Sequence, residues 1–172
     1  MGQILIEDHL EFDFRTAIVS TRFDDDGVND LSHCMKRVDF IVETANQLFF
    51  IEVKDLDNPN ARPQNVNQFL QELRSDALIA NKLVPKARDS FLFNHLTDCL
   101  PEGKARIYVV LIACGQLHPP ELLTLTDKLK RYLPIVGPFK QAWPQPYFDS
   151  CFITNFAEWN RIFQQFPITR IP

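Results

Sequence analysis

The segment "VDFIVETANQLFFIEVK" constrains the fold of this chain most strongly, because two strand patterns flank a short turn within it. Residues 38–43 and residues 48–54 are rich in β-branched and aromatic side chains, which is typical of β-strands. Ala45 and Asn46 lie between them. Because Asn tolerates the positive φ that tight hairpin turns require, these two residues predict a two-residue turn. We therefore predict an antiparallel hairpin.

This hairpin predicts a cluster of charges at one end of one face. With a turn at residues 45–46, Asp39 lies opposite Glu52, and Lys54 points to the same side. Two carboxylates in directly opposed positions lie about 5 Å apart and repel each other, so a compensating cation is expected. Mg²⁺ prefers hard oxygen ligands and is commonly held by one or two carboxylates. The alternative is a salt bridge from Lys54 to these acids at the end of the sheet.

The other face of the hairpin is wholly apolar and therefore predicts core packing. Strand alternation assigns six residues to that face: Val38, Phe40, Val42, Phe49, Ile51 and Val53. A charged cluster opposite an apolar face is costly for a purely structural strand pair. This contrast favours a functional site over a salt bridge at a sheet end.

The remaining periodicity predicts one α/β domain over residues 1–172. Leu10, Phe12 and Phe14 alternate with acids as in a strand, although a short helix over residues 7–19 is a competing interpretation. A loop is expected from residue 23 to residue 34. The other predicted elements are helices at 64–82 and 86–99, a doubly covered strand at 106–114, a helix ending near 133, a strand at 147–154, and a helix capped by Asn155 that ends near 166.

Composition excludes several classes of protein. Apolar residues make up 45% of the 172 residues and charged residues 23%, which is ordinary for a folded globular chain. The sequence shows no leader and no apolar run that could span a bilayer, so no membrane partner and a cytoplasmic location are expected. The four cysteines form no C-x-x-C pair, which favours reduced thiols. A net charge of −4 does not suggest a nucleic-acid coat, so nucleic-acid binding would need a local basic patch. Residues that could form one are Lys36, Arg37, Lys82, Lys86 and Arg88.

The stretch "VDF" followed by "FIEVK" resembles the motif of the PD-(D/E)XK nuclease superfamily, to which many restriction endonucleases and DNA-repair nucleases belong. The resemblance covers residues 36–55. It implies that Asp39 and Glu52 bind Mg²⁺, for which Mn²⁺ can substitute, and that Lys54 acts at the nucleophilic water. The backbone carbonyl of Val53 is a further metal ligand by the same analogy. Val38 replaces the proline that usually precedes the aspartate. The implied fold is a restriction-endonuclease-like mixed β-sheet core flanked by helices.

Many members of the superfamily add a further acid from an element that precedes the hairpin. In this chain Glu7, Glu11 and the acidic run at residues 24–26 are the candidates, and we rank Glu11 ahead of Asp24. Gln68, on the helix that follows the lysine, is a candidate helper residue. For each of these residues, a solvated polar surface is the competing interpretation.

The sequence thus predicts a metal-dependent endo- or exonuclease that hydrolyses phosphodiester bonds, in DNA rather than RNA, in a defence or DNA-processing system. A chain of this length has little room for a separate sequence-reading domain, so we expect it to act on nucleic-acid structure or ends, within a homo-oligomer, or beside a partner protein that supplies targeting. The alternative is a catalytically inactive nuclease fold that serves as a binding or scaffold protein. A small toxin or immunity-type protein is a third interpretation that composition does not separate from these.

Overall fold

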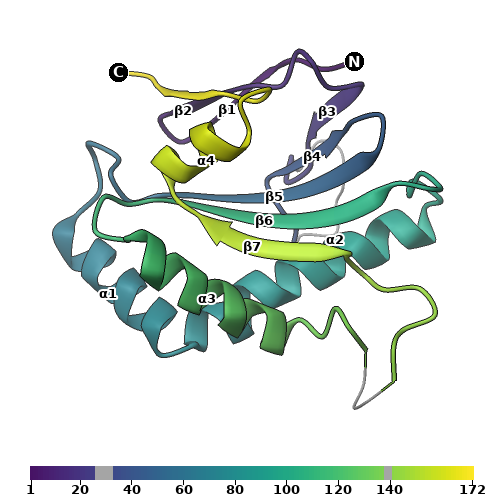
Figure 1. Cartoon of the computed structure of the whole chain (residues 1–172). Helices are drawn as coiled ribbons and strands as arrows, with labels where there is room; N and C mark the ends of the chain where they lie inside the picture. Colours follow the sequence, from purple (N-terminus) through teal and green to yellow (C-terminus); the bar gives the residue numbers. More distant parts are fainter. Residues whose placement is uncertain (26–32, 138–140) are drawn as a thin grey trace.

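The computed structural model describes residues 1–25, 33–137 and 141–172, and these form a mixed α/β fold with two β-sheets (Figure 1). The strands are β1 (Ile4–Glu7), β2 (Leu10–Asp13), β3 (Val19–Arg22), β4 (Phe40–Glu43), β5 (Gln47–Asp55), β6 (Ala105–Ala113), β7 (Ser150–Thr154) and β8 (Ile168–Arg170). The helices are α1 (Pro63–Arg74), α2 (Val84–Leu96), α3 (Pro119–Tyr132) and α4 (Phe156–Ile162), with a π-helical segment, η1 (Ile79–Leu83), directly before α2.

The central sheet has the strand order β3-β4-β5-β6-β7. Strands β3, β4 and β5 pair antiparallel, whereas β5, β6 and β7 pair parallel. Parallel neighbours require crossover connections, and α1, η1 and α2 connect β5 to β6, while α3 connects β6 to β7. These helices cover one face of the sheet, and the small β1-β2-β8 sheet lies with α4 on the other (Figure 1).

Both faces of the central sheet are buried, and alternation along β5 supplies both cores. Phe50 packs with Tyr108 and with the helices of the first face, whereas Ile51 packs with Phe12 and Trp159 of the second face. Glu52 follows the same alternation and therefore points toward the helical face. A fully buried carboxylate on that face needs cationic partners.

The predicted hairpin register is confirmed. Glu43 pairs with Leu48 and Ile41 pairs with Phe50, as expected from a turn at residues 45–46. The turn itself closes differently from the prediction, because Asn46 does not adopt a positive φ. Instead the hydroxyl of Thr44 accepts a hydrogen bond of 3.0 Å from the backbone N–H of Gln47. The backbone N–H of Thr44 also donates to the carbonyl of Gln47 at 2.8 Å, so one backbone and one side-chain hydrogen bond close the turn.

Val38 departs from the predicted strand alternation. It belongs to the core on the helical face, not to the core that contains Phe40. The regular strand β4 begins only at Phe40, so alternation does not extend back to Val38. The backbone N–H of Val38 donates to the hydroxyl of Ser90 on α2 at 2.9 Å, which fixes this approach to the strand.

Several other elements differ from the sequence prediction. The strand interpretation holds near the N-terminus, where β1 and β2 form a hairpin around Asp8 (φ 53°), and the helical alternative at 7–19 is wrong. The single helix expected at 64–82 ends at Arg74, because Asp76 adopts a left-handed φ of 68°. The last helix ends at Ile162 instead of residue 166. Strands β3 and β8 were not predicted, since their short sequences, VSTR and ITR, contain one apolar residue each and show no alternation.

In the described ranges, no helix combines the length and apolar character that a bilayer crossing needs.

Candidate active site

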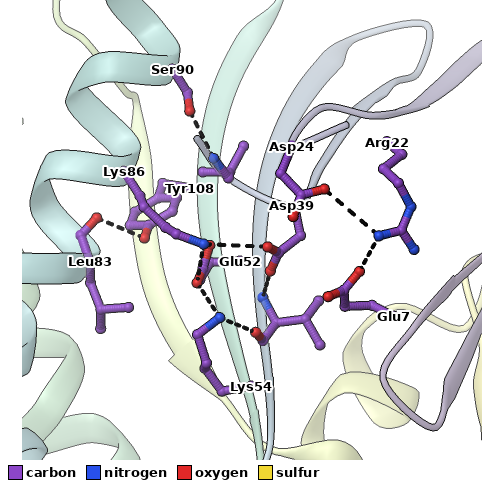
Figure 2. A network of polar contacts seen from close by, with 12 residues as sticks. Glu7, Arg22, Asp24, Asp39, Glu52, Lys54, Leu83, Lys86, Ser90 and Tyr108 are labelled. Carbon is purple, nitrogen blue, oxygen red and sulfur yellow. Dashed lines mark hydrogen bonds and ion pairs between the residues drawn. The ribbon is translucent and has the colours of Figure 1, made fainter. Parts of the chain in front are cut away.

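Asp39 and Glu52 converge on one ammonium group at the helical face of the central sheet (Figure 2). Their exposed fractions are 2% and 0%. The Nζ atom of Lys86, on α2, lies 2.7 Å from each carboxylate oxygen of Glu52 and 3.3 Å from Oδ1 of Asp39. A single cation at this point is therefore within reach of both carboxylates.

Asp39 is held in place by the neighbouring strand. Its Oδ2 accepts a hydrogen bond of 2.6 Å from the backbone N–H of Val53. Asp39 lies immediately before β4, where the strand ladder no longer uses that N–H. The carboxylate thus takes the position of a backbone acceptor, and its second oxygen remains directed at the site.

Lys54 lies on the same side as Glu52, as its position two residues along β5 predicts. Its ammonium contacts Oε1 of Glu52 at 2.6 Å and donates to the carbonyl of Val53 at 2.8 Å. The Lys54 side chain is 36% exposed, so the ammonium lies between the buried acid and solvent.

Burial and charge shift the protonation of this group. Burial, reinforced by the nearby Asp39 carboxylate, raises the pKa of Glu52 to about 7, although Lys54 and Lys86 oppose the rise. Burial lowers the pKa of Lys54, but Glu52 and Asp39 outweigh burial and hold that pKa above its ordinary value. Lys54 is therefore a cation at neutral pH when no metal neutralises these acids.

A second set of carboxylates meets Asp39 from its other side. Glu7 at the end of β1, Asp24 after β3 and Asp39 each place a carboxylate oxygen within 4.8 Å of the others. Arg22 pairs with Glu7 and lies 3.7 Å from Oδ1 of Asp24 (Figure 2). That Oδ1 atom is buried and accepts no hydrogen bond within the described chain. Burial and the charge of Asp39 raise the pKa of both Glu7 and Asp24.

The structure brings Glu7 and Asp24 to Asp39, and it does not bring Glu11 there. Glu11 pairs with Ile6 across the β1–β2 hairpin and shares the outer face with that half-exposed side chain. Register alone therefore separates it from the site, contrary to our ranking of Glu11 ahead of Asp24. Asp26, also in the predicted acidic run, lies outside the described residues.

Gln68 does not contact the acidic site. It lies on the exposed side of α1 and donates a hydrogen bond of 2.9 Å to Glu72. The competing interpretation, a solvated polar face, therefore describes this position better than a helper residue does.

Lys86 is the site residue whose role sequence reasoning missed. The sequence indicates it only as part of a basic rim, with no link to the two acids. Its position follows from the packing of α2 across β5, which brings Lys86 next to Glu52, a residue 34 positions earlier in the chain. No local pattern encodes that contact, and the one available signal is an unpaired excess of acids in the hairpin.

The residues present fit a divalent cation. Four carboxyl groups (Glu7, Asp24, Asp39 and Glu52) meet three cationic side chains (Arg22, Lys54 and Lys86), so acidic groups outnumber cationic groups in the cluster. Oδ1 of Asp24, which accepts no hydrogen bond within the described chain, adds a further oxygen atom that can bind a metal ion. Carboxylate oxygens are hard ligands of the kind that Mg²⁺ and Mn²⁺ prefer.

Comparisons of the chain with protein-family models, with curated proteins and with solved structures find no match. The function of the chain is therefore inferred from its sequence motif and from the geometry of this site.

Proposed function

We propose that this protein is a metal-dependent nuclease of the PD-(D/E)XK type, which hydrolyses phosphodiester bonds. One observation carries the proposal: the buried carboxylates of Asp39 and Glu52 converge on one point, where both contact the ammonium of Lys86, with Lys54 beside them. Two buried acids that face one point are costly for a fold to keep, and a divalent cation at that point would neutralise both of them, which favours a role in metal binding.

Asp39 and Glu52 would hold the metal ion, and Glu7 or Asp24 would complete the acidic set. When bound, Mg²⁺ or Mn²⁺ supplies Lewis-acid stabilisation of the charge that develops on the phosphate. Lys54, cationic and partly exposed, can orient a water molecule or bind a phosphate oxygen at the boundary with solvent. The carbonyl of Val53 accepts from Lys54, and it keeps a second lone pair for a ligand.

The arrangement of elements supports a restriction-endonuclease-like core. The acidic residues lie on an antiparallel hairpin whose second strand, β5, also pairs parallel with β6. Helices α1 and α2 follow β5 and cover the face that carries Glu52 (Figure 1). A mixed central sheet flanked by helices is what the proposed fold requires.

DNA rather than RNA is the substrate that the motif resemblance favours, in a defence or DNA-processing role. A second copy of the chain or a partner protein would direct the nuclease to its substrate.

A scaffold function is the second candidate, and one observation favours it. Lys86 and Lys54 together contact both oxygens of Glu52, so the buried charge is already neutralised by the chain itself. If this ion-pair network is complete without a metal ion, the fold would bind partners without catalysis.

Cleavage assays separate the two functions. Labelled single-stranded DNA, duplex DNA and RNA would be incubated with Mg²⁺, with Mn²⁺ or with a chelator. Glu43→Gln is the matched control, because Glu43 lies on the same face of the hairpin but pairs with Lys104 at 2.6 Å.

The nuclease proposal expects metal-dependent cleavage by the parent and by the control. It also expects near-complete loss in Asp39→Ala, Glu52→Ala and Lys54→Ala, with effects that do not add in combination. Full activity in any one of these three variants would reject the proposed site. Absence of cleavage of every substrate by the parent would favour the scaffold function.

A further inference from the structure

A cavity of about 470 Å³ opens directly beside Glu52 on the helical face. Its volume falls in the range of about 300–1,000 Å³ that is common for small-molecule and cofactor sites. Four lysines line it, namely Lys36, Lys54, Lys82 and Lys86, and Glu52 is the one acid among its lining residues. This local excess of positive charge contrasts with the net charge of −4 for the whole chain.

The four lysines divide into two pairs. Lys54 and Lys86 are engaged with Glu52, at the inner wall. Lys36 donates from Nζ to the backbone carbonyl of Asn81 at 2.8 Å, which is a neutral partner. The charge of Lys36 is therefore not balanced by a carboxylate at its ammonium among the described residues.

Lys82 is also available to an anionic ligand. Its side chain is 60% exposed, and its single ion pair within the described chain is a 3.1 Å contact with Glu72. Exposed pairs of this kind contribute little stability, so an anion can replace Glu72 at small cost. Lys36 and Lys82 thus provide two cationic groups beside the proposed active site.

The rest of the cavity wall is apolar. Phe69 of α1 contributes an aromatic ring, and Leu78 and Leu83 contribute buried aliphatic surface. Leu83 and Lys82 both belong to the π-helical segment η1, and Leu78 immediately precedes it. Short π-helical segments widen a helix locally and occur often at functional sites. In this protein the segment carries both the cationic and the apolar lining.

We propose that this cavity binds one unpaired nucleotide of the DNA strand that is cut, an inference that rests on the proposed nuclease function. Its phosphate pairs with Lys36 and Lys82, and its base packs against Phe69. A concave site with an apolar wall admits an unstacked base, whereas a base inside a duplex is stacked and cannot enter. The substrate class is therefore single-stranded DNA or an unpaired end.

Binding can be measured separately from cleavage. A short fluorescein-labelled single-stranded DNA would be titrated with the protein in a chelator, and fluorescence anisotropy would be followed at several salt concentrations. The variants are Lys36→Gln combined with Lys82→Gln, and Phe69→Leu, which keeps an apolar side chain while it removes the ring. Lys130→Gln, an exposed lysine on α3 away from this cavity, is the matched control.

The proposal expects the parent to bind the single strand more tightly than the matching duplex. Phe69→Leu should weaken binding about tenfold, since removal of one base–aromatic stack has an effect of that order. The double lysine variant should reduce the slope of log K against log[salt] by about 0.7, because the two lysines together neutralise one phosphate, and each neutralised phosphate of a single strand contributes about 0.7 to that slope. Lys130→Gln should bind like the parent.

Parent-like binding by both the double lysine variant and Phe69→Leu would overturn the nucleotide site, and so would a preference for duplex. If the parent cleaves DNA but these variants bind unchanged, the cavity assignment fails and the nuclease proposal stands. If the variants lose binding as expected but no form cleaves any substrate, the cavity assignment stands as a binding site and the nuclease proposal fails.

Discussion

The protonation of Glu52 should make the stability of this protein fall as pH rises toward neutrality. The pKa of Glu52 in the folded chain is about 7, above its ordinary value of 4.5. The folded state therefore binds the Glu52 proton more tightly than the unfolded state does. Between pH 4.5 and about pH 7, the folded chain binds more protons at Glu52 than the unfolded chain does. The free energy of unfolding therefore decreases as the pH rises.

The size of this effect follows from the same two values. Each pH unit between 4.5 and about 7 changes the free energy of unfolding by about 1.4 kcal/mol for one group. The full interval gives a loss of about 3 kcal/mol. Glu52 is fully buried, so solvent screening removes little of this effect. Glu52→Gln removes the titrating group and keeps the shape of the side chain.

The assay is urea unfolding of the parent and of Glu52→Gln in a chelator, from about pH 4.5 to about pH 8. Relative to the variant, the parent should lose about 3 kcal/mol across this range. Because other carboxylates titrate in both proteins, the difference between the two curves isolates Glu52. Parallel curves would refute the reasoning, since they would mean that Lys54 and Lys86 keep Glu52 ionised throughout.

Three further predictions concern the same site. The affinity for Mg²⁺, followed by titration calorimetry, should rise about tenfold for each unit of increasing pH below about pH 7, because the ion must displace the proton of Glu52; a flat profile would exclude Glu52 as a ligand. Lys86→Met should destabilise the metal-free protein by about 3 kcal/mol in thermal melts, because it removes the ammonium that contacts both Asp39 and Glu52. Mg²⁺ should stabilise this variant more than it stabilises the parent. Phe40→Ala, on the opposite face of the hairpin, should lose about 3–5 kcal/mol equally with and without Mg²⁺, and a metal-dependent loss would mean that the two faces are coupled.

The hairpin was predictable because period-two alternation and a short turn together fix a register. The pairs Glu43–Leu48 and Ile41–Phe50 follow from the sequence in this way. The placement of Glu52 and Lys54 on one side of β5 follows from the same period. Strand β6 was predictable as well, since "RIYVVLIAC" is apolar at every position but the first and so must be covered on both faces.

The partners of Asp39 and Glu52 were not predictable from local pattern. Lys86 reaches them through the packing of α2, and Asp24 reaches Asp39 from the chain after β3, an unpredicted strand of four residues. The preference for Glu11 failed for a similar reason. Its neighbour across the strands, Ile6, lies on the outer face, and only the pairing of β1 with β2 reveals which acid points inward.

The most direct test of the central claim is whether Asp39 and Glu52 share a divalent cation. Electron paramagnetic resonance can measure the free Mn²⁺ that remains as each protein is added. We predict that the parent and the Glu43→Gln control bind Mn²⁺ alike, and that Asp39→Asn and Glu52→Gln bind it at least about tenfold more weakly, because loss of even an outer-shell partner of a metal ligand weakens binding by about 10–100-fold. Equal Mn²⁺ binding by all four proteins, or none by the parent, would contradict the shared site.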